Sequence, residues 1–334
     1  MEIFIDESGT FAIRDDGSSV GAVGALVVTE SQFPILERRY AQLRPLLPKD
    51  QGEVKGRLLG ESDVARVVDI ARRSGLIYEV TVVDLAPEDA AAVEEHRTGQ
   101  CEGLTRKLTK QHHPDLVASV YALRERLEQM PLQLYAQGVA TFDLLWRTLS
   151  HATAYYSQRE PESLARFRWV VDAKAADGVT GWEEWWSKVV KPFMQSRSLQ
   201  EPFPELEGGD YSHLGANEMP IPDYLVKEFP RLKGGTGLAL SGAFDQIEFS
   251  ARAPTGLELV DVLTNAVRRA LLGRLGQQGW RGLSGVMIHR RGPTYIRPVG
   301  FGEDQRVIPP ATAAVLRQLG TGGRSMLTEK PLLL

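Results

Sequence analysis

The sequence predicts an α/β fold in which one sheet is flanked by helices. Three observations support this fold class: short β-branched segments that end in an acid, amphipathic segments between them, and a long central stretch with helical patterns only. The chain has 334 residues, of which 43% are hydrophobic and 25% charged, as in an ordinary globular protein with a buried core. We therefore expect a single domain over residues 1–334.

Two strands are expected at the start of the chain. Residues 2–6 form a short apolar segment that ends in Asp6, and residues 20–29 form a second one that is rich in small side chains. The segment 15–18, Asp-Asp-Gly-Ser, separates them and is typical of a turn. Together these features predict a β-hairpin.

Two helices and a third strand are expected next. The first helix spans residues 32–47, and the second begins near residue 62 and ends at Gly75, with apolar residues at helical spacing. Residues 49–60 between the helices are polar and contain several glycines, which predicts a loop. Residues 78–85 are rich in β-branched side chains and predict a strand.

The middle of the chain predicts an insertion. Residues 87–166 show only helical patterns, which prolines interrupt, so we expect a helical insertion between two strands of one sheet. Residues 168–172 return to strand character and end in Asp172. A tryptophan-rich helix is expected over residues 182–194.

The last third begins with a segment that has no regular pattern. Residues 198–237 contain five prolines and six glycines, and a loop of this length predicts a functional lid or a mobile segment. Residues 243–250 alternate like a strand, and residues 256–273 are typical of an amphipathic helix. We expect a terminal hairpin over residues 286–299.

Composition limits the possible functions. The net charge of −4 gives no general basic surface for nucleic acid, although an enzyme that cleaves phosphodiesters needs only a local basic wall. Cys101 is the single cysteine, which excludes an intramolecular disulfide and a thiolate zinc cluster. No apolar run approaches the ~18 residues of a membrane span, and the acidic N-terminus has no signal-peptide pattern. We expect a cytoplasmic protein with no membrane partner. The sequence leaves a protein partner or a homo-oligomer open.

Four acids lie where chemistry is expected. Asp6 and Asp172 end two strands, Glu53 lies in the polar loop, and Asp261 lies on the last long helix. A carboxylate at the end of a buried strand needs a partner or a cation, and open α/β sheets bind ligands at that end. Phosphodiester hydrolysis can use two divalent cations ~4 Å apart, held by converging carboxylates. The four acids are therefore candidate catalytic residues and ligands for Mg²⁺ or Mn²⁺.

These acids lie in motifs that resemble those of a known family, domain-of-unknown-function family 3800. The motifs are Ile5-Asp6-Glu7-Ser8-Gly9, Glu53-Val54-Lys55-Gly56, Val170-Val171-Asp172 and Gly256-Leu257-Glu258-Leu259-Val260-Asp261. The resemblance spans residue 1 to about residue 275. That family is grouped with the ribonuclease H-like superfamily. The resemblance implies an RNase H-like mixed sheet flanked by helices and a nuclease-like or integrase-like ancestry. It also implies that the metal ligands are Asp6, Glu53, Asp172 and Asp261. Superfamily enzymes usually carry the second acid on the first helix, whereas Glu53 is expected in or beside a loop.

Each acid also has a structural interpretation. Asp6 could accept hydrogen bonds from the turn at Ser8-Gly9. Glu7 points to the opposite side of the strand from Asp6, so we expect it on the surface. Glu53 and Lys55 could form an exposed ion pair of little energetic weight. Asp172 could simply begin a loop.

The helix that carries Asp261 has a polar stripe. Glu258, Asp261, Asn265 and Arg268 follow one another at helical spacing, while the other side of the helix is apolar. This pattern is typical of the solvent-facing side of an amphipathic helix. Asn265 could also support Asp261 through its amide.

Four cations are candidates for contacts with a nucleic-acid backbone. Lys55 lies two residues after Glu53, and Lys174 lies two residues after Asp172. Arg290 and Arg291 are expected at the tip of the terminal hairpin, where they could form a basic wall.

Three functions remain open from the sequence. The first is a metal-dependent nuclease that hydrolyses phosphodiesters. The second is a non-catalytic RNase H-like scaffold, as one part of a defence or mobile-element system. The third is a haloacid dehalogenase-like phosphatase, whose nucleophile motif is similar to Asp6-Glu7-Ser8-Gly9-Thr10, with Ser8 at the position of the general acid.

Overall fold

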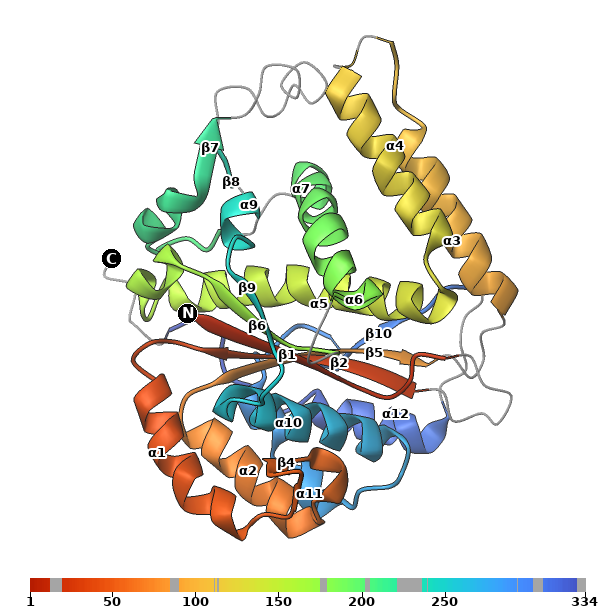
Figure 1. Ribbon diagram of the computed structural model, residues 1–334. Coiled ribbons are helices and arrows are strands. Elements are labelled where there is room, and N and C mark those ends of the chain that lie inside the picture. The colour runs from red at the N-terminus through yellow and green to blue at the C-terminus, as the bar shows by residue number, and fades with distance from the viewer. Residues whose placement is uncertain are drawn as a thin grey trace.

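A mixed sheet with helices on both faces forms the centre of the molecule (Figure 1). The α/β class with a mixed sheet flanked by helices is therefore confirmed. The computed structural model describes residues 1–12, 20–84, 90–110, 112, 114–174, 179–201, 205–220, 236–238, 240–292, 294–302 and 309–328. Among these residues, no helix combines the length and the apolar character needed to cross a membrane.

The sheet has six strands in the order β10-β5-β2-β1-β6-β9. Their bounds are β1 (Glu2–Ser8), β2 (Val20–Val28), β5 (Ile77–Asp84), β6 (Arg168–Asp172), β9 (Ile247–Ser250) and β10 (Arg297–Val299). Strands β1, β2 and β5 pair antiparallel in turn. Strand β6 lies parallel to β1, β9 lies parallel to β6, and β10 lies parallel to β5.

The register between β1 and β6 places two of the predicted acids at one end of the sheet. Ile5 lies opposite Val171 in this parallel pair. Because the strands run in the same direction, the next residue of each, Asp6 and Asp172, follows at the same edge. The carboxyl ends of β1 and β6 are therefore neighbours in the middle of the sheet.

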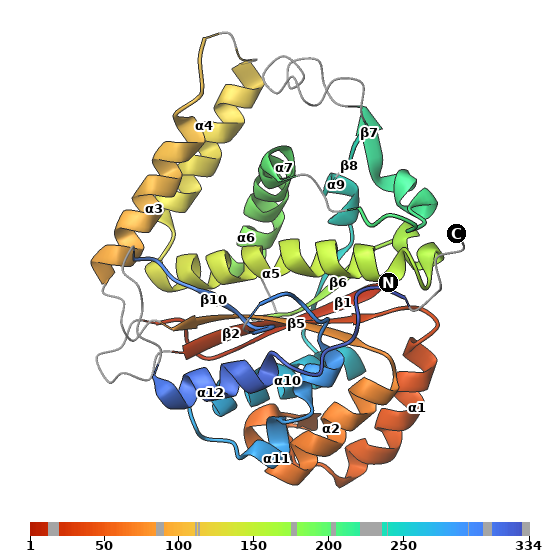
Figure 2. The ribbon, with the colours of Figure 1, turned by 180° about the vertical axis from the view of Figure 1, so that it is seen from behind.

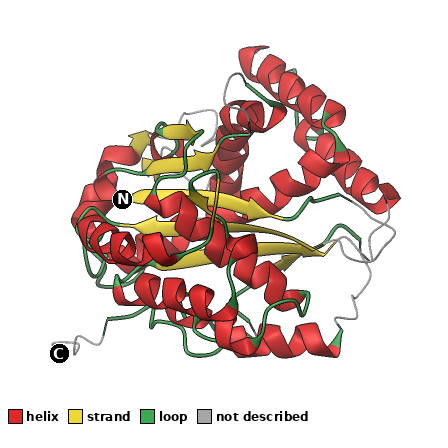
Figure 3. Ribbon diagram, turned by 60° about the horizontal axis from the view of Figure 1, so that its bottom comes forward, coloured by secondary structure: helices red, strands yellow, loops and turns green. Residues whose placement is uncertain are grey.

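One face of the sheet is covered by helices from both ends of the chain (Figures 2 and 3). These are α1 (Phe33–Leu43), α2 (Glu61–Arg73), α10 (Thr255–Leu271), α11 (Gln277–Trp280) and α12 (Pro310–Leu319). Side chains alternate along β1, so Phe4 belongs to the core on this face. Gly256 lies so close to Phe4 that a β-carbon would fall 2.4 Å from its ring. The beginning of α10 is thereby held against β1.

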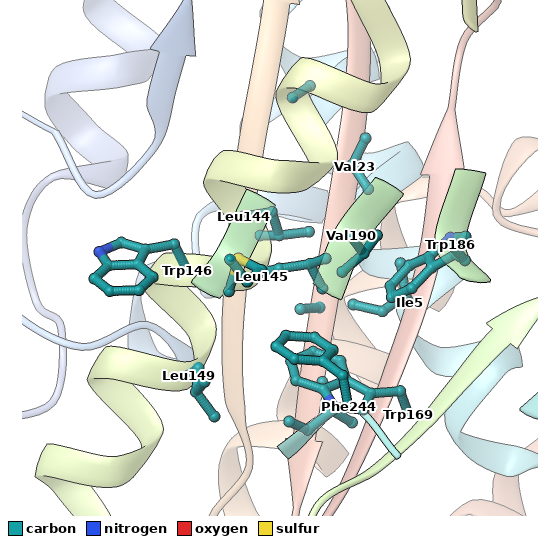
Figure 4. Close-up of a cluster of buried hydrophobic side chains, with 14 of the residues drawn as sticks. Ile5, Val23, Leu144, Leu145, Trp146, Leu149, Trp169, Trp186, Val190 and Phe244 are labelled. Atoms are coloured by element: carbon teal, nitrogen blue, oxygen red, sulfur yellow. The ribbon is translucent and has the colours of Figure 1, made fainter. Parts of the chain in front are cut away.

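The other face is covered by α5 (Leu132–Tyr156), α6 (Gly181–Trp185) and α7 (Lys191–Gln200). A π-helical turn, Trp186–Val190, joins α6 to α7. Figure 4 shows Leu144 and Leu145 of α5 beside Val190, with Ile5 and Trp186 also in the cluster. Ile5 belongs to this core because it points to the side of β1 opposite Phe4.

The central helical segment, 87–166, divides into two parts. Helices α3 (Ala90–Thr105) and α4 (Pro114–Gln129) lie side by side and extend away from the sheet (Figures 1 and 2). Helix α5, in contrast, crosses the sheet and packs against β2 and β5. It is buried along most of its length, so it belongs to the main core.

The proline- and glycine-rich segment, 198–237, contains described structure at several places. Helix α7 runs into it, a 3₁₀ helix spans Ser212–Asn217, and β7 (Glu218–Pro220) pairs with β8 (Thr236–Leu238). Residues 202–204 and 221–235 lie outside the described residues, as does the turn expected at 15–18.

Two element predictions near the C-terminus need correction. The strand expected over 243–250 is found but begins only at Ile247, because α9 (Leu240–Ala243) includes residue 243. The hairpin expected over 286–299 is not formed by the described residues of this segment, 286–292 and 294–299. Ile288 instead pairs in parallel with Arg324, and β10 pairs in parallel with β5. The two arms of the expected hairpin thus bind different neighbours, which no local pattern can reveal.

Candidate carboxylate site

Three aspartates converge at the carboxyl end of β1. Asp6 is only 8% exposed and faces α10, while Asp172 approaches from β6 and Asp261 from α10. Burial raises the pKa of Asp6 well above its ordinary value, and the charges of Asp261 and Asp172 raise it further. Asp6 and Asp172 follow paired residues of adjacent parallel strands, and the charge of Asp261 also acts on Asp6. The structure thus brings together three of the four acids predicted from the sequence.

Asp261 is fixed by the neighbouring loop as well as by Asp6. The backbone N–H of Gly56 donates to Oδ2 of Asp261 at 2.7 Å. Burial raises the pKa of Asp261, while this hydrogen bond from Gly56, the charges of Lys55 and Arg57, and the adjacent Asp6 side chain oppose the increase. The pKa values of Asp6 and Asp261 are both raised, so the two acids favour a bound proton or a bound cation.

Asp172 lies at the more open side of the site, with its side chain 34% exposed. Burial raises the pKa of Asp172 to about 6, and the charges of Glu53 and Asp261 add to this effect while Lys55 opposes it. At neutral pH, Asp172 is therefore mostly ionised.

We expect the Asp172→Asn variant to be more stable than the parent chain in metal-free buffer at neutral pH. The carboxyl ionises near pH 6 when folded but near its ordinary value of 3.8 when unfolded, so folding disfavours the charged form. The free energy of unfolding should rise by about 1 kcal/mol after allowance for solvent screening. This increase is complete above about pH 6 and disappears as the pH falls below about 4. Melting temperatures measured across this range with a chelator present test the effect.

The matched control for this prediction is Asp69→Asn. Asp69 pairs with Arg72 and Arg73, and the hydrogen bond from Arg72 lowers the pKa of its carboxyl. Removal of the Asp69 charge should lower the free energy of unfolding at neutral pH. This effect is opposite to the increase expected for Asp172→Asn. A drop in melting temperature for Asp172→Asn would show that the acid holds the local structure together.

Two lysines supply positive charge to the site. Nζ of Lys55 lies 2.7 Å from Oε2 of Glu53. Nζ of Lys174 contacts Glu7 and lies 3.8 Å from Oδ2 of Asp172. Burial lowers the pKa of Lys174, and the neighbouring acids oppose this decrease. Lys55 and Lys174 thus lie within the carboxylate site, where the sequence predicted contacts to phosphate.

The loop that carries Glu53 is anchored to the start of α10. It contains the short strands β3 (Lys49–Asp50) and β4 (Glu53–Val54) and a 3₁₀ turn, Gly56–Leu58. Oε1 of Glu53 accepts from the N–H of Ala253 at 3.1 Å. Together with its Lys55 partner, this contact lowers the pKa of Glu53. Glu53 therefore lies at the rim of the site, close enough to Asp172 to affect its charge.

Glu258 is the main anchor of this loop. It is 1% exposed, and its carboxylate accepts from Arg44, Tyr40 and the N–H of Val54. At Gly56 the loop comes so close to α10 that a β-carbon would lie 3.0 Å or less from backbone atoms of Asp261 and Val262. A glycine is needed there for the N–H to reach Asp261.

The expectation that the polar stripe of α10 faces solvent is wrong. Glu258 and Asn265 are buried, and Asp261 faces the site. Asn265 donates to Oγ of Ser8 at 3.2 Å. The helix is covered by β1 and β2 on one side and by the 49–59 loop on another. A polar stripe can indicate a buried polar site as well as a solvent-facing side.

Glu7 also differs from the sequence-based expectation. Its side chain is only 13% exposed and pairs with Lys174. Within the described part of the chain, its Oε2 atom is buried and has no hydrogen-bond partner. The reason is that β1 lies in the middle of the sheet and both of its faces are covered. The alternation of side chains correctly separates Glu7 from Asp6 but does not place Glu7 at the surface.

Arg290 is not part of an exposed basic wall. Its guanidinium pairs with the fully buried Glu79 of β5, which Arg147 and His151 also contact. Burial lowers the pKa of Arg290, although Glu79 opposes this effect. Arg291 is exposed beside it. Because its guanidinium is turned to Glu79, Arg290 does not join the exposed Arg291 in a basic surface.

Glu183 has a role that the sequence reasoning missed. It accepts from the backbone N–H of Lys174 at 3.0 Å and closes a capping box with Thr180 at the start of α6. The Thr-x-x-Glu spacing is a known sign of a helix start and could have identified it. Through this contact, α6 fixes the backbone of Lys174.

The oxygen donors of the site suit a hard cation, but the described side chains are not arranged as a complete metal site. The acids offer carboxylate oxygens, which Mg²⁺ and Mn²⁺ prefer. Among the described residues, however, no three His, Cys, Asp or Glu side chains are already arranged as a ligand set. Lys55 and Lys174 instead neutralise part of the negative charge. A cation would relieve the repulsion that raises the pKa of Asp6.

Comparison of the chain with models of known protein families, with curated proteins and with solved structures found no match. The family resemblance drawn from the four motifs therefore stays a prediction.

Proposed function

We propose that the chain is a metal-dependent phosphodiesterase, a nuclease of RNase H-like fold. The observation that carries this proposal is the convergence of Asp6 and Asp172, at the carboxyl ends of adjacent strands, with Asp261 of α10, where burial and then the neighbouring acids raise the pKa of Asp6. Such clustered acids are unfavourable unless a proton or a cation is bound. Mg²⁺ or Mn²⁺ is the cation that this donor chemistry favours.

The fold supports the RNase H-like part of the proposal. The resemblance leads us to expect a mixed sheet flanked by helices, with acids on the first strand, a central strand and a C-terminal helix. The sheet has this mixed character, and Asp6, Asp172 and Asp261 lie on β1, β6 and α10. Glu53 differs, because it comes from a short strand in a loop after α1 rather than from a helix.

Each side chain has a distinct role in the proposed reaction. Asp6, Asp172 and Asp261 would hold the cation. Glu53 adds negative charge at the rim. Mg²⁺ or Mn²⁺, when bound, lowers the pKa of water and offsets the negative charge that develops on the phosphate.

The two lysines suit a phosphate substrate. Lys55 and Lys174 are both about one-third exposed, and each pairs with an acid at the edge of the site. The ammonium groups of Lys55 and Lys174 would contact the phosphate oxygens of a substrate bound at this edge. The local positive charge suffices for a nucleic-acid backbone despite the net charge of −4.

A cleavage assay with purified protein tests the proposal. Fluorescently labelled single-stranded DNA, duplex DNA, RNA and an RNA–DNA hybrid are incubated with Mg²⁺, Mn²⁺, Ca²⁺ or a chelator. We expect cleavage of at least one substrate with Mg²⁺ or Mn²⁺, and none with the chelator. Cleavage that is independent of metal, or no cleavage of any of the four, would contradict the proposed activity.

A non-catalytic scaffold is the second candidate, and one observation favours it. The N–H of Glu7 donates to Oδ1 of Asp6 at 2.8 Å, so Asp6 also stabilises its own local backbone. In a scaffold, Lys55 and Lys174 would remain paired with the acids permanently. Calorimetric titration with Mn²⁺ separates the two candidates, because a scaffold of this kind binds no cation at the site.

The phosphatase alternative fits the site less well. A nucleophilic aspartate has to be ionised, whereas burial and the neighbouring acids raise the pKa of Asp6. Ser8, at the position of the general acid, is buried and accepts a hydrogen bond from Asn265. Both features oppose an aspartyl-phosphate reaction.

A further inference from the structure

A cavity lies on the face of the sheet opposite α10, away from the carboxylate site. Its volume is about 370 Å³, within the range of small-molecule sites. Helices α3, α4, α5, α6 and α7, the π-helical turn between α6 and α7, and strand β10 form its walls. Its aromatic and charged lining includes Phe142, Asp143, Trp185, Phe193, Arg197 and Arg297. The four predicted catalytic acids are not among the lining residues.

Aromatic rings form much of the cavity wall. Phe142 of α5 and Phe193 of α7 meet edge to face, with ring centroids 5.7 Å apart. Trp185 of α6 is held by stacking on Trp182 at 5.2 Å. Gly138 permits this arrangement, because a β-carbon there would lie 2.7 Å from Nε1 of Trp185. These rings are fixed by packing and offer planar apolar surfaces to a flat ligand.

Arg197 brings positive charge to the aromatic wall. Its guanidinium lies over the rings of Phe142 and Trp146, 5.6 Å and 5.0 Å from their centroids. Figure 4 shows Trp146 apart from the other labelled side chains of the buried cluster. Arg197 also pairs with Glu201, but that acid is exposed and such a surface pair is weak. A ligand anion could therefore replace or share the Glu201 contact.

The remaining lining charges also favour an anion. Arg297 is exposed at the cavity and has no ion-pair partner within the described parts of the chain. Asp143 is a lining acid, but its carboxylate accepts from Thr81 at 3.2 Å and lies 3.6 Å from Nη1 of Arg147. Arg147, which is not a lining residue, thus neutralises part of the charge of Asp143. The cavity as a whole has positive charge beside aromatic walls.

We propose that this cavity binds a planar aromatic anion. The ring would lie against Phe142, Phe193 and Trp185, and the acidic group would contact Arg197 and Arg297. Both contacts are charge-assisted, and guanidinium groups suit carboxylate, sulfonate and phosphate alike. This site is independent of the proposed nuclease activity, because it lies on the other face of the sheet.

The test uses 2-naphthoate as the probe and the full chain as the protein. Binding is followed by tryptophan fluorescence, because Trp185 lines the cavity, and by calorimetry. We expect saturable binding of one probe per chain. The neutral analogue 2-naphthylmethanol should bind about tenfold more weakly, because it lacks the charge that the arginines recognise.

Two variants and one control locate the binding. Arg297→Gln should weaken 2-naphthoate binding about tenfold. Val139→Trp should fill the cavity and abolish binding. Arg291→Gln removes an exposed arginine that does not line the cavity and should change nothing. Absence of saturable binding, equal affinity for the neutral analogue, or unchanged affinity in both cavity variants would overturn the proposal.

Discussion

Replacement of Asp6 by Asn is expected to reduce metal-dependent cleavage by about a thousandfold or more. A catalytic cation supplies several kcal/mol to the transition state, and each ~1.4 kcal/mol corresponds to tenfold in rate. Asp6 is the aspartate on which the charges of Asp261 and Asp172 both act, so its loss removes the centre of the proposed cation site. The measurement is the initial rate of cleavage of the best substrate with Mg²⁺ or Mn²⁺.

The variant itself should fold normally. An uncharged amide in place of Asp6 relieves repulsion with Asp172 and Asp261, so the melting temperature without metal should not fall. Asp245→Asn is the matched control. Asp245 precedes β9 at the opposite end of the strand from the site and pairs with the surface residue Lys191, so cleavage should be unchanged. Full activity in the Asp6 variant would remove the acid from the reaction.

Replacement of Glu79 by Ala is expected to destabilise the protein by about 3 to 5 kcal/mol. Glu79 is fully buried, and its carboxylate is the shared partner of Arg147, Arg290 and His151. The alanine variant would leave two largely buried guanidinium groups without this partner, which is far more costly than the loss of the pair itself. Chemical denaturation at neutral pH measures the effect.

The pH dependence of this loss follows from the charge of Glu79. Burial alone would raise the pKa of Glu79, but Arg290, His151 and Arg147 hold it well below its ordinary value. The stabilisation is therefore complete above the unfolded pKa of 4.5 and disappears only as the pH falls through the much lower folded pKa.

Glu248→Ala provides the matched control for Glu79. Glu248 is half-exposed and pairs with Arg168, so its loss should cost about 0 to 1 kcal/mol. An equally small loss for Glu79→Ala would mean that Arg147 and Arg290 find other partners or solvent, and that the buried cluster contributes little to stability.

Much of the central sheet could be predicted because its strands carry local patterns. The β-branched residues of β5 and β6 and the apolar start of β1 mark strands without reference to their neighbours. The place of α5 in the main core could not be predicted, because a helical pattern does not say which helix covers the sheet. Strand β10 was expected as one arm of a hairpin, and its true partner could not be predicted, because its three residues pair with β5, which lies far away in the sequence.

The site was predictable where acids end strands. Asp6 and Asp172 follow apolar strand residues, and parallel neighbours place such acids at one edge. The buried setting of Asp261 was not predictable from the stripe on α10, because periodicity does not distinguish solvent from a loop that packs over the helix. Arg290 was misplaced because its partner, Glu79, lies 211 residues away in the sequence.

The most direct test of the shared cation site is a crystal grown with Mn²⁺ and examined by anomalous scattering. We predict manganese between the carboxylates of Asp6, Asp172 and Asp261, with the ammonium group of Lys174 moved away from Glu7. Crystals that bind Mn²⁺ only elsewhere, with Lys174 still paired with Glu7 and the three aspartates without a metal, would contradict the account.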